Sequence, residues 1–254
     1  MNTVELYDLG TGPYQEVWDL QAAVQQRLID EKLRRHKDEQ YNPSSIPNDV
    51  LLLVEHPHVY TLGKSGDSSH LLKGLKELAD IDAEFIEIDR GGDITYHGPG
   101  QIVGYPILDL DRYFTDIHKY LRCLEEIFIR TCGDYGLDAQ RIEGLTGVWV
   151  GDKKICALGI KCSRWITMHG FAFNVNTDLS YFNHIVPCGI TDKEVTSLEN
   201  LLGRRVDPDE VKKRVIHHFE NVFEVNVVGN RSLPELEAQF SYLINSGQEK
   251  PSGA

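Results

Sequence analysis

The chain has 254 residues, a length typical of one large domain or two small ones, and long enough to bury a core without disulfides or structural metals. It carries 26 Lys and Arg residues against 39 Asp and Glu, a formal net charge of −13, which argues against a nucleic-acid binder because phosphate contacts dominate such binding. The longest apolar run, 50–54, is far shorter than the roughly 20 residues of a membrane helix. No secretory signal is readable at the N-terminus, so we expect a cytoplasmic protein.

Taken in chain order, the hydrophobic pattern predicts alternating helices and strands. Helical spacing of apolar residues covers 14–35 and 113–135, and Asp207 followed by Pro208 predicts the start of a third helix that ends near Val222. Strand-like segments are expected at 50–54, 84–89, 102–108, 147–150, 154–160 and 165–175. The polar segment 34–49 is predicted to be a long surface loop, and 245–254 a frayed tail. We therefore expect one domain over 1–254, of the α/β class (α+β type), with a mixed, largely antiparallel sheet flanked by helices.

A glycine-rich segment at 89–101 (DRGGDITYHGPGQ) is the first candidate for a functional site. Glycines let the backbone approach a ligand closely, and polar side chains between them can orient it. The segment matches neither G-x-G-x-x-G nor G-x-x-x-x-G-K-[ST], so it is not one of these phosphate-binding motifs. A structural loop between two strands is the alternative interpretation.

The cysteines provide a second candidate. They are odd in number and none has C-x-x-C spacing, which argues against a disulfide framework and a cysteine-rich zinc site: Cys123, Cys132, Cys156, Cys162 and Cys188. Cys188 lies in a Pro-Cys-Gly turn, where a thiol is reachable, whereas a buried cysteine acting as a small hydrophobe is the alternative for the others. Lys154 and Lys161, seven residues apart on one predicted strand, point to opposite faces, so one of them can face a given cleft.

The histidines suggest structural or ligand-contacting roles. His56, His58, His70, His97 and His169 show no H-E-x-x-H or similar ligand spacing, so we expect no metal. A serine hydrolase is disfavoured because the chain contains no G-x-S-x-G.

Four separated motifs occur together in the order and spacing of the lipoyl(octanoyl) transferases, a family that the chain resembles from the first helix to about Leu202. They are Arg90 to Gln101, Lys154 to Gly159, His169-Gly170-Phe171-Ala172-Phe173-Asn174 and Pro187-Cys188-Gly189. The resemblance implies the fold of the biotin and lipoate protein ligase catalytic domain. It also implies an enzyme that moves an octanoyl group from octanoyl-acyl carrier protein to a lysine of a lipoyl domain, the first step of protein lipoylation.

The resemblance implies a role for particular residues. Cys188 would be the nucleophile that forms a thioester, and Lys154 would lower the pKa of its thiol. The acyl group would contact a wall matched by Arg90, Gly91, Gly92, Asp93, Ile94, Thr95, Tyr96, His97, Ala157, Leu158, Gly159, Gly170, Phe171 and Ala172. The acceptors would be lipoyl domains of 2-oxoacid dehydrogenases and the glycine cleavage H protein. No cofactor, nucleic acid or membrane partner is expected, and we expect a monomer.

The implied chemistry is physically consistent. A thiolate exchanges readily with a thioester, and a lysine that has lost its anionic partner can act as a base toward the incoming amine. Because acyl carrier proteins and lipoyl domains are acidic, we predict a local basic rim made by Lys153, Lys161 and Arg164, with Arg141 a weaker candidate.

Three other functions remain open. A lipoate or biotin protein ligase would activate its acid with ATP and needs no cysteine nucleophile. An amidotransferase would keep the cysteine but take octanoyl from another lipoyl-bearing protein. A non-catalytic binding module on the same fold would retain its ligand after Cys188→Ser, with no turnover.

Overall fold

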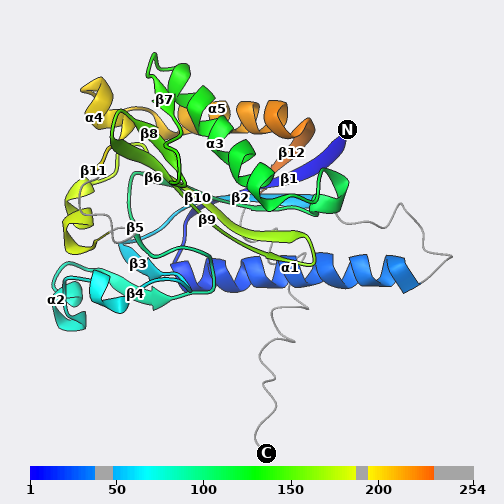
Figure 1. Ribbon diagram of the computed structural model, residues 1–254, viewed down its shortest axis with the longest axis horizontal. Coiled ribbons are helices and arrows are strands. Elements are labelled where there is room, and N and C mark those ends of the chain that lie inside the picture. The colour runs from blue at the N-terminus through cyan, green and yellow to red at the C-terminus, as the bar shows by residue number, and fades with distance from the viewer. Residues whose placement is uncertain (38–47, 187–193, 232–254) are drawn as a thin grey trace, which may run out of the picture.

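The computed structural model describes residues 1–37, 48–186 and 194–231, and a nine-stranded mixed sheet forms its centre (Figure 1). The strands lie in the order β12-β1-β2-β6-β10-β9-β8-β7, and β11 pairs with β9. Their bounds are β1 (Asn2–Thr11), β2 (Asp49–Glu55), β6 (Gln101–Ile107), β7 (Ala139–Gln140), β8 (Val148–Val150), β9 (Lys153–Ser163), β10 (Ile166–Asn174), β11 (Glu194–Val195) and β12 (Val225–Arg231). The pairings from β2 across to β7 are antiparallel, whereas β1 runs parallel to both of its neighbours, so the predicted fold class is confirmed.

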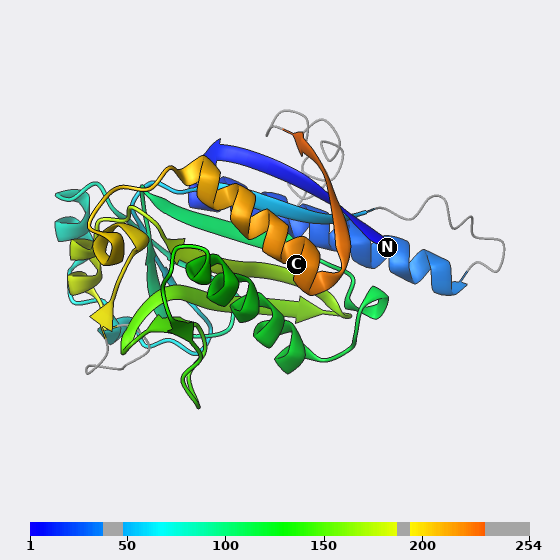
Figure 2. The same ribbon diagram turned by 90° about the horizontal axis from the view of Figure 1, so that it is seen from above.

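Helices cover both faces of this sheet, and its buried strands are therefore apolar on both sides. In β2, Leu51 and Leu53 face one core cluster, while Val50, Leu52 and Val54 face the other. The first cluster is covered by α3 (Ile117–Gly133) and α5 (Pro208–Phe223), and the second by α1 (Tyr14–Lys37). Figures 1 and 2 show α3 and α5 together on one side of the sheet and α1 along the other.

A smaller three-stranded sheet with its own core lies beside the main one, at the lower left of Figure 1. It contains β3 (Val59–Leu62), β4 (Glu84–Glu87) and β5 (Ile94–His97), with α2 (Leu75–Ala79) and the short 3-10 helices η2 (Ser68–His70) and η4 (Leu179–His184) nearby. The glycine-rich segment is thus not wholly irregular, since β5 lies within it and pairs with β3. This pairing joins residues far apart in the chain, which the local composition does not reveal.

The remaining elements are short: a 3-10 helix η3 (Leu110–Arg112) and α4 (Leu198–Leu202). The predicted helix starts at Tyr14 and Asp207 are confirmed, and the Asp207 side chain accepts a hydrogen bond from the backbone N–H of Asp209. The start predicted at Tyr113 is wrong, because Tyr113 ends η3 and α3 begins at Ile117 after its N-cap Asp116. The predicted surface loop at 34–49 is wrong at both ends, because α1 continues to Lys37 and β2 begins at Asp49. Residues 38–47 and the predicted tail at 245–254 lie outside the described residues. No helix in the described ranges is long and apolar enough to cross a membrane.

Candidate active site

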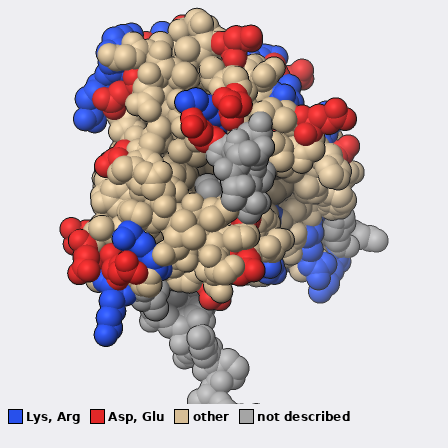
Figure 3. Space-filling view, turned by 60° about the vertical axis from the view of Figure 1, so that its left-hand side comes forward, with Lys and Arg blue, Asp and Glu red and all other residues tan. Residues whose placement is uncertain are grey.

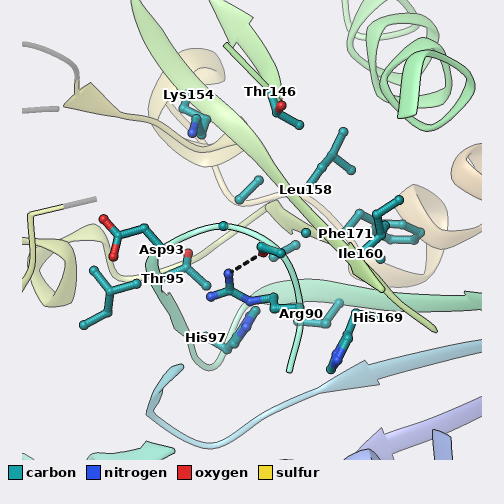
Figure 4. A pocket seen from close by; sticks show the side chains of 18 of the residues that line it. Arg90, Asp93, Thr95, His97, Thr146, Lys154, Leu158, Ile160, His169 and Phe171 are labelled. Carbon is teal, nitrogen blue, oxygen red and sulfur yellow. Dashed lines mark hydrogen bonds between the residues drawn. The ribbon is translucent and has the colours of Figure 1, made fainter. Parts of the chain in front are cut away.

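A cavity of about 480 Å³ lies between the glycine-rich segment and the hairpin formed by β9 and β10 (Figure 4). Lys154 and Thr146 stand on one side of it, and Arg90, His97 and His169 on the opposite side. Three of the four motifs singled out in the sequence, 90–101, 154–159 and 169–174, therefore meet at one cavity. The last two are side by side because β9 and β10 pair antiparallel along their length.

Most of the predicted acyl-binding residues line this cavity. They are Arg90 to Thr95, His97, Ala157, Leu158, Gly159, Gly170, Phe171 and Ala172. Tyr96 does not: its ring belongs to the core of the small sheet, and its hydroxyl lies 2.7 Å from His58 Nδ1. Side chains alternate along a strand, so Thr95 and His97 of β5 face the cavity while Tyr96 faces away, and the prediction for Tyr96 is corrected.

Other cavity residues were missed in the sequence as site residues. They include Tyr14, Gln101, Tyr105, Thr146, His169 and Asn174. Gln101, His169 and Asn174 belong to the motifs 90–101 and 169–174, so their place in the sequence could have identified them as site residues. Nothing local marks Tyr14 or Tyr105, which reach the cavity from α1 and β6.

The position of the Arg90 side chain explains why the strand packed against it, β9, has glycine at position 159. Its guanidinium donates to the Thr61 carbonyl at 2.8 Å and to the Gly91 carbonyl at 3.1 Å, the contact dashed in Figure 4. A Cβ on Gly159 would stand 2.8 Å from Arg90 Cδ. The hairpin can therefore approach the arginine this closely because position 159 has no side chain.

Lys154 and Lys161 have different surroundings, and these show which of the two lysines faces the cavity. Lys154 lines the cavity, and among the described residues no carboxylate lies within ion-pair distance of it. Lys161 instead pairs with Asp89 at 2.5 Å and does not line the cavity. Lys154 is thus the lysine of this strand that a substrate in the cavity would meet.

A second polar pair lies at the far side of the cavity. His169 adopts a left-handed backbone with φ of 59° inside β10, and its Nε2 lies 2.9 Å from Asp89 Oδ1. Burial lowers the pKa of His169 to about 4, although Asp89 opposes this shift. The imidazole is therefore neutral near pH 7. Within the described ranges, no group of three or more His, Cys, Asp or Glu residues could hold a metal ion.

A buried chain of hydrogen bonds links the cavity to the strand that carries Lys154. His97 Nδ1 lies 2.8 Å from the Gln101 side-chain oxygen, and the Gln101 amide donates to Asn174 at 2.9 Å. The Asn174 amide donates to the carbonyl of Thr196, whose N–H donates to the Lys154 carbonyl at 2.9 Å. Because these hydrogen bonds follow one another without a break from His97 to Thr196, the backbone at Lys154 is tied to the cavity wall.

The four described cysteines are poor nucleophiles. Burial raises the pKa of all four thiols, to about 12 for Cys132, and well above the ordinary value for Cys156. Cys188 lies outside the described residues. Phe182 and Val195, which are described residues on either side of it in the sequence, both line the cavity.

The predicted basic rim is not a free positive surface. Lys153 pairs with Glu194 at 2.5 Å, Lys161 with Asp89, and Arg141 with Glu125 and Glu126. Figure 3 likewise shows acidic and basic side chains interspersed on the face that it presents. Of the four predicted cations, Arg164 is exposed at the far end of the β9–β10 hairpin. Most of this positive charge is therefore offset locally.

Comparisons with known proteins identify the family. The sequence model of the lipoyl protein ligase A/B catalytic domain matches residues 15–220. An octanoyltransferase from Flavobacterium johnsoniae is 54% identical over 231 residues, covering 89% of this chain and 98% of that protein. One from Bacteroides fragilis is 49% identical over 208 residues, covering 80% and 90%.

Solved structures agree at the level of the fold. A lipoate-protein ligase A bound with ATP superposes with a TM-score of 0.75 at 18% identity, covering 100% of this chain and 97% of that chain. A bipartite lipoate protein ligase from Thermoplasma acidophilum superposes with a TM-score of 0.72 at 17% identity, covering 96% and 93%. The chain belongs to the lipoyl protein ligase A/B catalytic domain family, in which relatives sharing about half of its residues are octanoyltransferases.

Proposed function

We propose that this protein transfers an octanoyl group from octanoyl-acyl carrier protein to a lysine of lipoyl domains, through a thioester on Cys188. The observation that carries the proposal is the convergence on one cavity of Lys154, the Arg90–Thr95 wall and the 157–159 and 170–172 segments. The reaction would run in the cytoplasm, in a monomer and without a cofactor.

Cys188 is proposed as the nucleophile on chemical grounds. The other four thiols have raised pKa values because of burial, so little of their thiolate is present near neutral pH. Cys188 belongs to a Pro-Cys-Gly sequence, and residues on both sides of it in the chain line the cavity. In the first half-reaction the Cys188 sulfur attacks the thioester carbonyl, and the carrier leaves as its own thiol. The octanoyl group remains on Cys188.

Lys154 is proposed to serve both half-reactions. As an ammonium it would stabilise the Cys188 thiolate, and no described carboxylate competes for it. After the carrier leaves, the neutral amine of Lys154 would accept the proton that the incoming lysine must lose to attack the acyl-enzyme. The products are an amide on the lipoyl domain and free Cys188.

The cavity suits an eight-carbon chain with a polar head at one end. Its apolar lining comes from several strands and includes Val103, Leu158, Ile160, Phe171 and Ala172. Burial of each methylene contributes about 0.8 kcal/mol, so the depth of this apolar part can select chain length. Lys154 stands on one side of the cavity, where a thioester or an amine would react (Figure 4).

The intact mass of the protein after mixing with octanoyl-acyl carrier protein, without ATP, tests the proposal. We expect an octanoyl adduct on the wild type, none on Cys188→Ser, and discharge of the adduct when a lipoyl domain is added. Cys123→Ser is a matched control, since Cys123 is a half-buried helix residue whose thiol pKa is raised, and it should form the adduct. If the wild type and Cys188→Ser both form no adduct, and the lipoyl domain is modified only with free octanoate and ATP, the protein is a ligase. If octanoyl-lipoyl domain is the better donor, it is an amidotransferase.

A further inference from the structure

We propose that Trp149 is a positioning residue that holds the ammonium group of Lys154 over its indole ring, at the cavity. The inference rests on the role proposed above for Lys154. Trp149 itself does not line the cavity, and it would act on the reaction only through the lysine.

The two residues meet because of an irregular register between two strands. Trp149 of β8 is the direct cross-strand partner of Lys154 of β9, and the register shifts between Val148 and Trp149. Lys154 Nζ lies 4.8 Å from the centroid of the Trp149 ring, within the range at which a cation is attracted to an aromatic face. The indole is 1% exposed, so its packing gives the ammonium a fixed partner.

The side-chain stem of Lys154 is also confined. A Cβ built on Gly147 would stand 3.3 Å from Lys154 Cε and 2.7 Å from the Cys156 carbonyl oxygen. Gly147 has φ of 122°, so its backbone and the close Cys156 carbonyl require glycine, and the Lys154 stem packs directly beside it. The Thr196 N–H fixes the Lys154 carbonyl at 2.9 Å. The lysine is therefore held at its backbone, its stem and its charged end.

An aromatic partner suits this lysine better than a carboxylate does. A carboxylate would accept hydrogen bonds from the ammonium and offset its charge, as Glu194 does for the neighbouring Lys153. An aromatic face attracts the charge without accepting a conventional N–H hydrogen bond. The Lys154 ammonium is then oriented while its N–H donors remain available to an anion in the cavity.

Steady-state kinetics of octanoyl transfer test this inference in Trp149→Leu and Trp149→Phe, with Phe219→Leu as the matched control. Phe219 is a fully buried aromatic of α5 that does not line the cavity. We expect Trp149→Leu to lower kcat about 2- to 30-fold with little change in KM for the donor, since a cation–π contact contributes about 0.5–2 kcal/mol. Trp149→Phe keeps an aromatic face and should recover most of the loss. A loss in Trp149→Leu no larger than in Phe219→Leu would overturn the inference.

A second measurement avoids the risk that Trp149→Leu fails to fold. The chain has three tryptophans, so Trp18→Phe with Trp165→Phe leaves Trp149 as the sole site for fluorinated tryptophan. Fluorination withdraws electrons from the ring at nearly constant shape, and kcat should fall stepwise as fluorine atoms are added. A kcat independent of fluorination contradicts the proposed contact.

A double-mutant cycle separates this inference from the proposed function. The alkylation rate of Cys188 at pH 7 is measured in wild type, Trp149→Leu, Lys154→Met and the double variant. If Trp149 acts through the lysine, Trp149→Leu slows alkylation in the wild type and has no effect in Lys154→Met. An equal effect in both backgrounds overturns the positioning role alone. Unchanged alkylation and transfer in Lys154→Met would overturn the role proposed for the lysine as well.

Discussion

Phe171 and Gly104 are direct cross-strand partners, and the ring of the phenylalanine covers the glycine so closely that a Cβ there would stand 2.0 Å from Phe171 Cζ. Phe171 lines the cavity and also packs on Phe128 of α3, with 4.6 Å between ring centroids. The absence of a side chain on β6 therefore sets the position of one wall of the site.

Gly104→Ala should destabilise the protein by about 1–3 kcal/mol, because the added methyl group displaces the Phe171 ring in a packed core. Urea unfolding measures the loss. Gly133→Ala in α3 is the control, since a Cβ there meets nothing within 4 Å and should be neutral or slightly stabilising. Gly104→Ala combined with Phe171→Leu should lose less stability than the sum of the single variants, and additivity would show that the two residues do not interfere.

Ala172→Val should shift the acyl preference of the enzyme toward shorter chains. Ala172 is buried and lines the cavity, so added methyl groups occupy space otherwise available to the chain. We expect the ratio of kcat/KM for octanoyl over hexanoyl donors to fall about fourfold for each methylene excluded. Ala139→Val, at a buried position outside the cavity, should leave the ratio unchanged. An unaltered ratio in Ala172→Val would place the acyl chain elsewhere.

Lys154→Met and Lys161→Met should differ strongly in transfer activity. Lys154 lines the cavity, whereas Lys161 is paired with Asp89. Loss of a group that transfers protons lowers rates about 100- to 10,000-fold, and we expect a loss in this range for Lys154→Met. Lys161→Met should lower the transfer rate less than about tenfold, since Lys161 contacts Asp89 and does not line the cavity. Single-turnover transfer to a lipoyl domain gives both numbers, and equal losses would contradict the assignment.

The stability of the protein should fall as the pH drops from about 6.5 to 4. Burial lowers the pKa of His56 and His169 to about 4, so the unfolded chain binds protons before the native state does. Their contribution is fully present above the unfolded pKa of 6.5 and is lost as the pH falls through this window. At pH 5 the loss should be about 2 kcal/mol for each histidine, measured by urea unfolding at pH 7 and 5. His56→Gln should flatten the dependence, whereas His118→Gln, at an exposed position, should not.

Lys32→Met should cost about 3 kcal/mol of stability. Lys32 is buried and contacts Asp109 and Asp111, each at 2.7 Å, so its removal leaves buried negative charge near Asp109. Arg34→Met is the matched control, because Arg34 is 70% exposed and pairs with Glu31 on the helix surface. It should change the free energy of unfolding by less than about 0.5 kcal/mol. Equal effects of the two variants would mean that the buried cluster adds nothing beyond a surface pair.

The elements and the motifs could be predicted from the sequence because both are local properties. Apolar spacing predicted α1 and α3, and Asp207 followed by Pro208 predicted the start of α5, which the structure confirms. The glycine-rich segment and the Lys154 strand were recognised from residues close together in the chain. Such signals need no knowledge of which strands become neighbours.

Which side chains share the cavity was decided by the tertiary structure. Strand alternation turns Tyr96 away from the cavity between two residues that line it, and the pairing of Lys161 with Asp89 leaves Lys154 as the cavity lysine. The contact between Trp149 and Lys154 depends on a register shift between β8 and β9. By itself, the sequence determined the helices, most of the strands and the motif residues through local patterns. The direction in which a strand side chain points, the register between two strands and the ion pair of a given lysine all depend on contacts between distant segments. Those contacts exist only once the sheet has formed.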